Sequence, residues 1–196
     1  MQVGDQRAAQ AAIDTLGAQG VRHIVLLTHH GFDADRALVG RLRGVDVVIG
    51  GDSHTLLGDF KALGVPAGGR YPTVLRNADG DTVCVGQAWE YAKAFGLMKV
   101  TFDAEGRVSR CDGQAALVIG EPFKRKDAAG TWQPMAPAEG EALKARLATQ
   151  PAVRVIAPDP QAAQTLAAFS GQVAAQKARP IGTAIEPLCL VRVPGE

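Results

Sequence analysis

Two short stretches of the sequence carry residues that are able to bind a divalent metal ion. The stretch "LLTHHGFDAD", residues 26–35, places His29 after an apolar run, and "VDVVIGGDSHT", residues 45–55, places Asp52 and His54 after another. Two imidazoles and a carboxylate form a mixed nitrogen and oxygen donor set, which favours a borderline divalent ion. The alternative is that both histidines are polar strand ends whose side chains are satisfied by backbone groups.

These candidate ligands meet only if the elements before them lie side by side. Residues 22–29 and 45–51 are continuous apolar runs, which is typical of strands buried on both faces of a parallel sheet. A helix through residues 37–44 separates them, with Asp33 or Asp35 as its predicted N-cap. Strand, helix and strand in this order indicate a parallel crossover, and ligands bind beyond the carboxyl ends of such strands. The sequence therefore predicts an α/β fold with the candidate ligands at one edge.

The rest of the chain alternates between helical and strand patterns. The sequence predicts a helix at 5–19, a long Gly- and Pro-rich loop at 56–80, a strand at 82–91, a hairpin at 97–113, helices at 136–149 and 158–180, and a strand at 181–193. Cys84 and Cys111 fall in predicted strands. They are either free buried thiols or a disulfide, which would require an oxidising compartment, and Cys189 has no evident partner.

Composition excludes several classes of partner. A formal net charge of +1 and an aromatic content of 5% give neither a basic surface nor a stacking surface for a nucleic acid polymer. No stretch approaches the roughly 18 apolar residues of a membrane span. The first residues lack the basic and apolar regions of a secretory signal. The chain is expected to be an ordinary globular protein.

The two metal-binding stretches resemble the metallophosphatase domain of the 5′-nucleotidase family, within the calcineurin-like phosphoesterase superfamily. In this family a Thr-His or Ser-His at a strand end is followed, after the next strand, by Gly-His-Ser-His or Gly-His-Ser-Gln. The counterparts here are "TH" at residues 28–29 and "GDSH" at 51–54. The resemblance continues through "YPTVLRNADGDTVCVGQAWEYAKAFGLMKVTFDAEGRV", residues 71–108, and "IGTAIEPL", residues 181–188, and so covers nearly the whole chain in order.

The resemblance implies a fold and a division of the chain. Residues 1–125 would form the C-terminal part of the metallophosphatase domain, a partial sandwich with a mixed sheet flanked by helices. Residues 126–180 would form a helical connector, and 181–196 the truncated start, with its first strand, of the 5′-nucleotidase C-terminal domain. The family's Asp-x-His, Gly-Asp and Gly-Asn-His motifs precede the matched segment, and its substrate-binding arginines and aromatic pair follow it. The chain is therefore expected to be a fragment.

Metal ligands carry over position by position from the family. By resemblance, His29 and Asp52 would bind the second of two divalent ions (zinc, manganese, magnesium or similar), and His54 would bind the first. Asp52 stands where the family usually has a histidine, so the site carries extra negative charge and the metal preference is expected to change. His30 is expected not to bind. Neither a catalytic residue nor a substrate-binding residue is assigned within the chain.

The resemblance also implies a function. The complete enzyme would hydrolyse nucleoside 5′-monophosphates or related nucleotides to nucleoside and phosphate, in the periplasm or outside the cell. The isolated chain is expected to be inactive, because both metal sites are incomplete, and to expose an apolar sheet face or a bare strand edge. Its expected partners are the nucleotide substrate, the missing N-terminal half or a second copy.

Two alternatives remain: a nucleotide-binding module without catalysis, and an interaction fragment. The glycines at 50, 51 and 58 do not have the dinucleotide-binding spacing.

Overall fold

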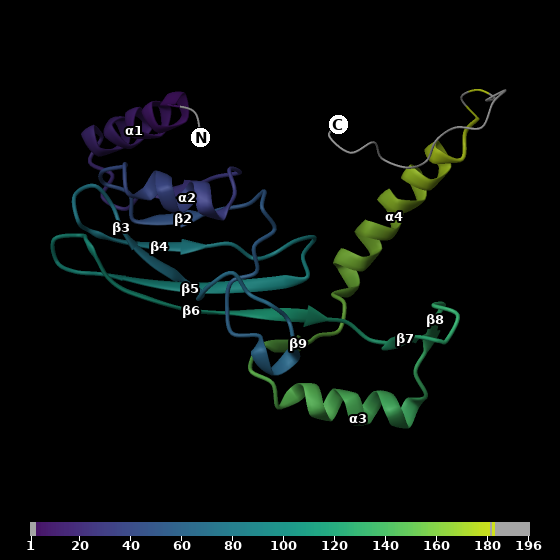
Figure 1. Ribbon diagram of the computed structural model, residues 1–196. Helices are drawn as coiled ribbons and strands as arrows, with labels where there is room; N and C mark the ends of the chain where they lie inside the picture. The colour runs from purple at the N-terminus through teal and green to yellow at the C-terminus, as the bar shows by residue number, and fades with distance from the viewer. Residues whose placement is uncertain (1–2, 181, 183–196) are drawn as a thin grey trace. The chain divides into compact units, whose positions relative to one another are not determined.

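The computed structural model describes residues 3–180 and residue 182. The predicted strand at 181–193 and Cys189 thus lie outside the described residues, apart from position 182. Contacts divide the chain into two units, Met1–Ile156 and Ala157–Glu196. In the first unit, α1 (Val3–Ala18) and α2 (Phe32–Val39), a four-stranded sheet and a second sheet are stacked in that order (Figure 1).

The four-stranded sheet contains the predicted crossover. Its strand order is β1 (Val25–Leu27), β2 (Val47–Ile49), β4 (Thr82–Gly86) and β3 (Thr73–Arg76). The pairs β1–β2 and β2–β4 are parallel and β3–β4 is antiparallel, so the sheet is mixed, as expected. Helix α2 (Phe32–Val39) connects β1 to β2, and α1 (Val3–Ala18) precedes β1.

The helices cover one face of this sheet. Ile13 of α1 and Val39 of α2 pack in one buried cluster with Val48 of β2 and Val85 of β4. Burial of an aliphatic side chain of this size contributes about 1.5–3 kcal/mol. The apolar periodicity that predicts the helices is therefore also what fixes them on the sheet.

A second sheet covers part of the opposite face. Strands β5 (Ala94–Phe102) and β6 (Val108–Ile119) form the predicted hairpin, and β9 (Val153–Val155) pairs with β6 in parallel. Val47 and Cys84, on the face away from the helices, pack in one cluster with Val108 of β6.

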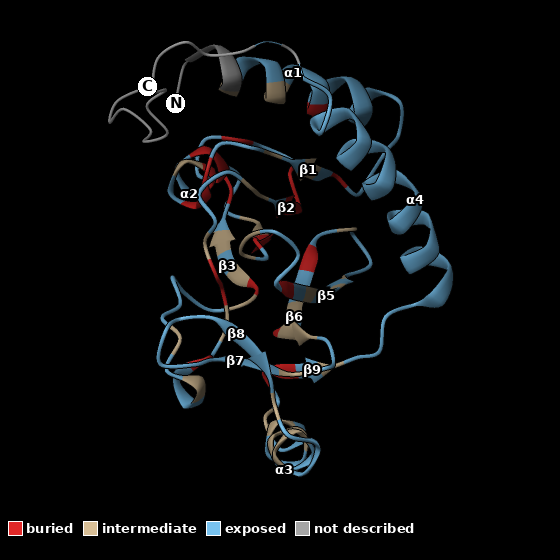
Figure 2. Ribbon diagram, turned by 90° about the vertical axis from the view of Figure 1, so that its right-hand side faces the viewer, coloured by how far each residue is buried: buried red, intermediate tan, exposed pale blue. Residues whose placement is uncertain are grey.

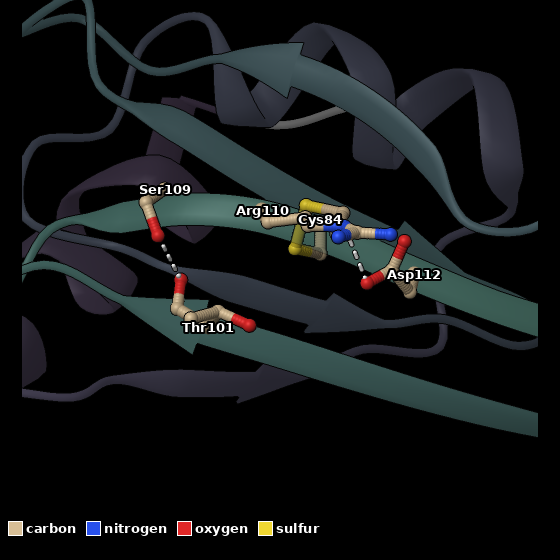
Figure 3. The surroundings of a disulfide bond; sticks show 6 residues. Cys84, Thr101, Ser109, Arg110 and Asp112 are labelled. Atoms are coloured by element: carbon tan, nitrogen blue, oxygen red, sulfur yellow. Dashed lines mark hydrogen bonds and ion pairs between the residues drawn. A yellow bond between two sulfur atoms is a disulfide. The ribbon is translucent and has the colours of Figure 1, made fainter.

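A disulfide joins the two sheets. Cys84 of β4 and Cys111 of β6 are bonded, with their Cα atoms 5.7 Å apart (Figure 3). Of the two possibilities that the sequence left open for these cysteines, the structure has the disulfide. Beside it on β6, Arg110 Nε lies 2.7 Å from Asp112 Oδ2, and Ser109 Oγ donates to the Thr101 carbonyl across the hairpin.

Strand β1 differs from the prediction that it is buried on both faces. Val25 and Leu27 are 58% and 75% exposed, although their strand neighbour Leu26 packs toward the helices. Within the described residues β1 pairs only with β2, so it is an edge strand. The buried residues lie mainly on α2, on the strands beside β1 and in the sheet-to-sheet contact (Figure 2). The exposed apolar edge expected from the sequence is therefore present.

The cap predicted for α2 is wrong. The helix begins at Phe32, with Gly31 at the N-cap and no side-chain cap, so Asp33 and Asp35 lie in its first turn. Gly31 has a φ of 89°, which glycine adopts without the steric penalty of a Cβ. The helix thus begins earlier than its apolar spacing indicates.

Several short elements were not predicted. The predicted loop at 56–80 contains a 3-10 turn, Lys61–Leu63, and strand β3. Strands β7 (Lys124–Lys126) and β8 (Trp132–Pro134) pair in an antiparallel hairpin, and β9 was also missed. Elements of three or four residues are too short for a periodic pattern to identify them.

The two later helices match their predictions. Helix α3 is Pro137–Ala148, and α4, in the second unit, is Pro160–Lys177 with the Asp159 carboxylate accepting a hydrogen bond from the Ala162 N–H. Among the described residues, no helix is both long enough and apolar enough to cross a bilayer.

Candidate functional site

The ends of β1 and β2 bring two of the predicted ligands to one place. Leu27 is paired with Ile49, and the Thr28 N–H donates to the Ile49 carbonyl at 3.0 Å, so both strands end at the same level. His29 follows one strand end directly, and Asp52 follows the other after two glycines. The crossover thus places both side chains at one edge of the sheet.

His29 and Asp52 have a geometry that fits a shared divalent ion. His29 Nε2 lies 3.7 Å from Asp52 Oδ1, and the two side chains are 81% and 57% exposed. Two ligands bonded at about 2.1 Å in a tetrahedral arrangement lie about 3.4 Å apart. A small rotation of either exposed side chain closes the difference.

The His29 ring occupies the space beside Gly51 that a side chain would fill. A Cβ at Gly51 would lie 2.8 Å from His29 Nδ1, closer than such atoms approach. The absence of a side chain here lets the imidazole lie against the backbone of the neighbouring strand end. Gly51 thus leaves space for the side chain of the neighbouring strand end.

His54, the third predicted ligand, is held by a residue that the sequence did not indicate. Its Nδ1 lies 3.1 Å from Oε2 of Glu90, and the other carboxylate oxygen of Glu90 pairs with Lys93. The Lys93 ammonium, followed by the His54 ring, lowers the pKa of the Glu90 carboxyl. The Tyr91 ring meets the His54 ring edge-on, with 5.3 Å between centroids. The sequence predicts a strand over residues 82–91, whereas β4 ends at Gly86, so Glu90 lies in a loop that the prediction missed.

Gln87 fixes the loop that carries Asp52 and His54. Its buried side-chain amide donates to the Gly51 carbonyl at 2.7 Å and accepts from the Ser53 hydroxyl at 3.1 Å and from the Thr55 N–H. Ser53 Oγ in turn accepts from the Phe32 N–H at 2.9 Å, which links the loop to the start of α2. Buried amides of this kind are satisfied in full or are destabilising, so the network specifies one loop conformation.

Backbone strain is concentrated in two loops, the loop that carries Asp52 and His54 and the loop that carries Glu90. Among the described residues, the non-glycine positions with positive φ are Asp52 (74°), His54 (51°), Trp89 (59°), Tyr91 (47°) and Ala92 (57°). Asp and His adopt this region more readily than most residues, but the other three pay about 1–2 kcal/mol each. Strain of this kind is found where the surrounding structure holds a functional geometry.

A buried carboxylate lies behind the strand ends. Asp35 is almost fully buried, and neither its oxygens nor Thr28 Oγ1 has a hydrogen-bond partner among the described residues. Burial raises the pKa of the Asp35 carboxyl above its ordinary value. A Cβ at Gly50 would collide with its carboxylate. The sequence indicated Asp35 only as a possible helix cap.

The described residues bring together part of the predicted ligand set. His29 and Asp52 are adjacent, whereas His54 is paired with Glu90. No group of three or more His, Cys, Asp or Glu side chains in the described part of the chain is arranged to hold a metal ion. His30, predicted not to bind, is exposed. The arrangement amounts to one adjacent imidazole–carboxylate pair and a separately oriented imidazole.

Known proteins similar to this chain are 5′-nucleotidases, the family that the sequence resembles. A probable 5′-nucleotidase of Treponema pallidum is 32% identical over 183 residues, which cover 92% of this chain and 31% of that protein. The structure of a 5′-nucleotidase precursor from Thermus thermophilus matches with a TM-score of 0.63 and 34% identity, over 89% of this chain and 28% of that one. No protein-family model matches.

A second solved structure supports the fold. The Haemophilus influenzae NAD nucleotidase matches with a TM-score of 0.74 and 24% identity, over 85% of this chain and 34% of that one. The chain spans about a third or less of the length of these relatives.

Proposed function

The chain belongs to the 5′-nucleotidase family, and on this premise we propose that it supplies three metal ligands to a dimetal nucleotide phosphoesterase. His29 and Asp52 would hold one divalent ion, and His54 would contribute to the other. The observation that carries the proposal is the 3.7 Å approach of His29 Nε2 to Asp52 Oδ1 at two parallel strand ends.

The chemistry of the donors supports a zinc- or manganese-like ion. A pair of divalent ions, when bound, would supply Lewis-acid activation of the phosphate ester and of the attacking water. The chain's own contribution is to orient donors: the Gln87 network holds the loop that carries Asp52, and Gly51 leaves room for the His29 ring. The Asp52 carboxylate adds a charge that favours harder ions than an imidazole would.

The isolated chain is proposed to lack turnover. Catalytic metal sites use about three protein ligands for each ion, and the chain offers two for one and one for the other. No residue is assigned as a general acid for the leaving alkoxide. The exposed apolar edge at Val25 and Leu27 supports a need for a covering partner, either further residues of the same protein or a second copy of the chain.

The substrate is proposed to be a nucleoside 5′-monophosphate or a related nucleotide. One similar protein is named an NAD nucleotidase and two others are named 5′-nucleotidase, so a nucleotide is the common element of the three names. The proposed location is the periplasm or the cell exterior. The buried Cys84–Cys111 disulfide supports this, because such bonds persist in oxidising compartments.

Metal titration tests the assignment. Isothermal titration with Mn²⁺ or Zn²⁺ is run on the wild-type chain and on His29→Ala, Asp52→Ala and the double variant. The proposal expects binding by the wild type and a loss of at least tenfold in each single variant. The free-energy loss in the double variant should be smaller than the sum of the two single losses, because both residues hold one ion. His23→Ala, which changes a histidine at the other end of β1, is the matched control.

The outcomes separate the proposed function from the alternatives. Metal content unchanged in the double variant would remove the site, and a nucleotide-binding or interaction module would become the better description. Release of phosphate from AMP by the isolated chain, lost in the double variant, would overturn the proposed inactivity and leave the metal site standing.

A further inference from the structure

The contact between His54 and Glu90 has the form that metal-binding histidines show in their outer contacts. A ligating imidazole nearly always donates its second ring N–H to a carboxylate or a carbonyl, and this contact sets which nitrogen is free. Glu90 Oε2 lies 3.1 Å from His54 Nδ1. A proton on Nδ1 satisfies this contact and leaves the Nε2 lone pair without a proton.

Glu90 is itself held through the carboxylate oxygen that does not meet His54. Lys93 pairs with its Oε1, and the Lys93 ammonium lies 5.2 Å from the Trp89 ring centroid and 5.8 Å from that of Tyr91. The Lys93 N–H also donates to the Glu90 carbonyl at 3.0 Å. The carboxylate is therefore fixed by a cation and by its own backbone turn before it meets the imidazole.

The loop around Glu90 adopts a backbone that its residues disfavour. Trp89, Tyr91 and Ala92 all have positive φ, and so does His54 on the facing loop. The Trp89 N–H donates to the Thr55 carbonyl at 3.2 Å, which ties the two loops together next to His54. Such strain persists where the surrounding structure holds a functional geometry, and the geometry held here is the contact between the Glu90 carboxylate and the His54 ring.

We propose that Glu90 is a positioning residue for His54: it accepts the Nδ1 proton contact and so presents Nε2 as the nitrogen that meets a metal ion. The second part of this inference rests on the proposed function, whereas the tautomer does not. Glu90 would touch neither metal nor substrate. Glu90 would fix the orientation of the His54 ring and so adds a fourth residue to the three predicted ligands.

Nitrogen NMR of the metal-free chain tests the tautomer directly. The chain is labelled with ¹⁵N and held at pH about 8.5, above the ordinary imidazole pKa of about 6.5. His54→Gln identifies the His54 ring signals among the four histidines. The expected result is a ring protonated on Nδ1 in the wild type and in Glu90→Gln, which keeps an acceptor oxygen, and a shift toward Nε2–H in Glu90→Ala. Glu139→Ala, which removes an exposed carboxylate paired with Arg125, is the control.

Zinc titration of the same samples tests the orientation. The coordination shift should appear at Nε2 of His54, and Glu90→Ala should weaken the apparent Kd by about tenfold or more, with most of the affinity recovered in Glu90→Gln. A merely structural role for Glu90 would change neither the tautomer nor the nitrogen that binds zinc.

Distinct results overturn the inference and the proposed function. A wild-type His54 with its proton on Nε2, or a zinc shift at Nδ1, refutes the positioning role, and this result does not depend on whether any variant folds. A tautomer that depends on Glu90 in a chain that takes up no metal supports the positioning role and refutes the proposed function instead.

Discussion

Removal of the Cys84–Cys111 disulfide is expected to destabilise the first unit by about 3.5 kcal/mol. The two cysteines are 27 residues apart, and closing a loop of that length lowers the chain entropy of the unfolded state by about 12 cal/mol/K, or about 3.5 kcal/mol near 25 °C. Because folded stabilities are typically about 5–15 kcal/mol, this is a large share of the total. Among the described residues, this bond is also the disulfide that joins the two sheets.

The measurement is urea unfolding of Cys84→Ala/Cys111→Ala, followed by tryptophan fluorescence. All samples carry Cys189→Ser, so that no third thiol can exchange with the pair. With an m-value of about 2 kcal/mol/M, the midpoint should fall by about 1–2 M. Wild type in a reducing agent serves as the matched comparison, since it loses the bond but keeps both sulfur atoms.

Two results would refute the reasoning. A stability loss below about 1 kcal/mol in the alanine variant would show that the loop is already restrained in the unfolded chain. A reducing agent that destabilises the alanine variant as much as the wild type would show that its effect does not come from this bond. The expected pattern is a large effect of reduction on the wild type and none on the variant.

Three further predictions concern the strand ends. Gly51→Ala should displace the His29 ring, because its new Cβ would lie 2.8 Å from Nδ1, and should weaken Zn²⁺ binding about tenfold by calorimetry with the fold intact by circular dichroism. Asp35 has a raised pKa, so the folded state binds its proton more tightly than the unfolded state does. The stability that this proton contributes should therefore fall as pH rises above about 3.8. In urea unfolding, Asp35→Asn should lose this pH dependence, while Asp33→Asn, which changes an exposed carboxyl, should keep it. Leu27→Lys should reduce the binding of a dye that reports apolar surface and raise solubility, and unchanged dye binding would locate the exposed apolar surface elsewhere.

The crossover could be predicted because its signals are local. The apolar runs around β1 and β2 and the helix between them follow from composition over ten or fewer residues, and the parallel pairing of Leu27 with Ile49 follows from the handed connection. The adjacency of His29 and Asp52 came with it. What the sequence did not reveal is that β1 is an edge, because its apolar composition is the same whether or not a sheet covers it.

The remaining parts of the site depend on contacts between distant residues. Gln87 lies 36 positions from the Gly51 carbonyl that it binds, and Glu90 lies 36 positions from His54, so no local spacing indicates either one. The disulfide was left open for a similar reason, because cysteine connectivity cannot be deduced from sequence. The Gln87 amide and the Glu90 carboxylate both lie within residues 82–91, whose composition predicts a strand and not a loop with these contacts.

The stability of the site and that of the sheet stack are linked through β4. Cys84 lies on β4, and Gln87 follows directly after the end of this strand at Gly86. The chain then passes through the strained loop to β5, which pairs with the disulfide-bonded β6. One end of the loop that carries Glu90 thus follows a disulfide-bonded strand, and the other end enters β5, which is paired with the second disulfide-bonded strand. Three disfavoured φ values in that loop persist only if its ends are held, so loss of the disulfide should loosen the Glu90–His54 contact before the unit unfolds. The His54 tautomer in a reduced, folded sample would show this as a partial shift toward Nε2–H, whereas an unchanged tautomer would mean that the Gln87 network alone holds the loop.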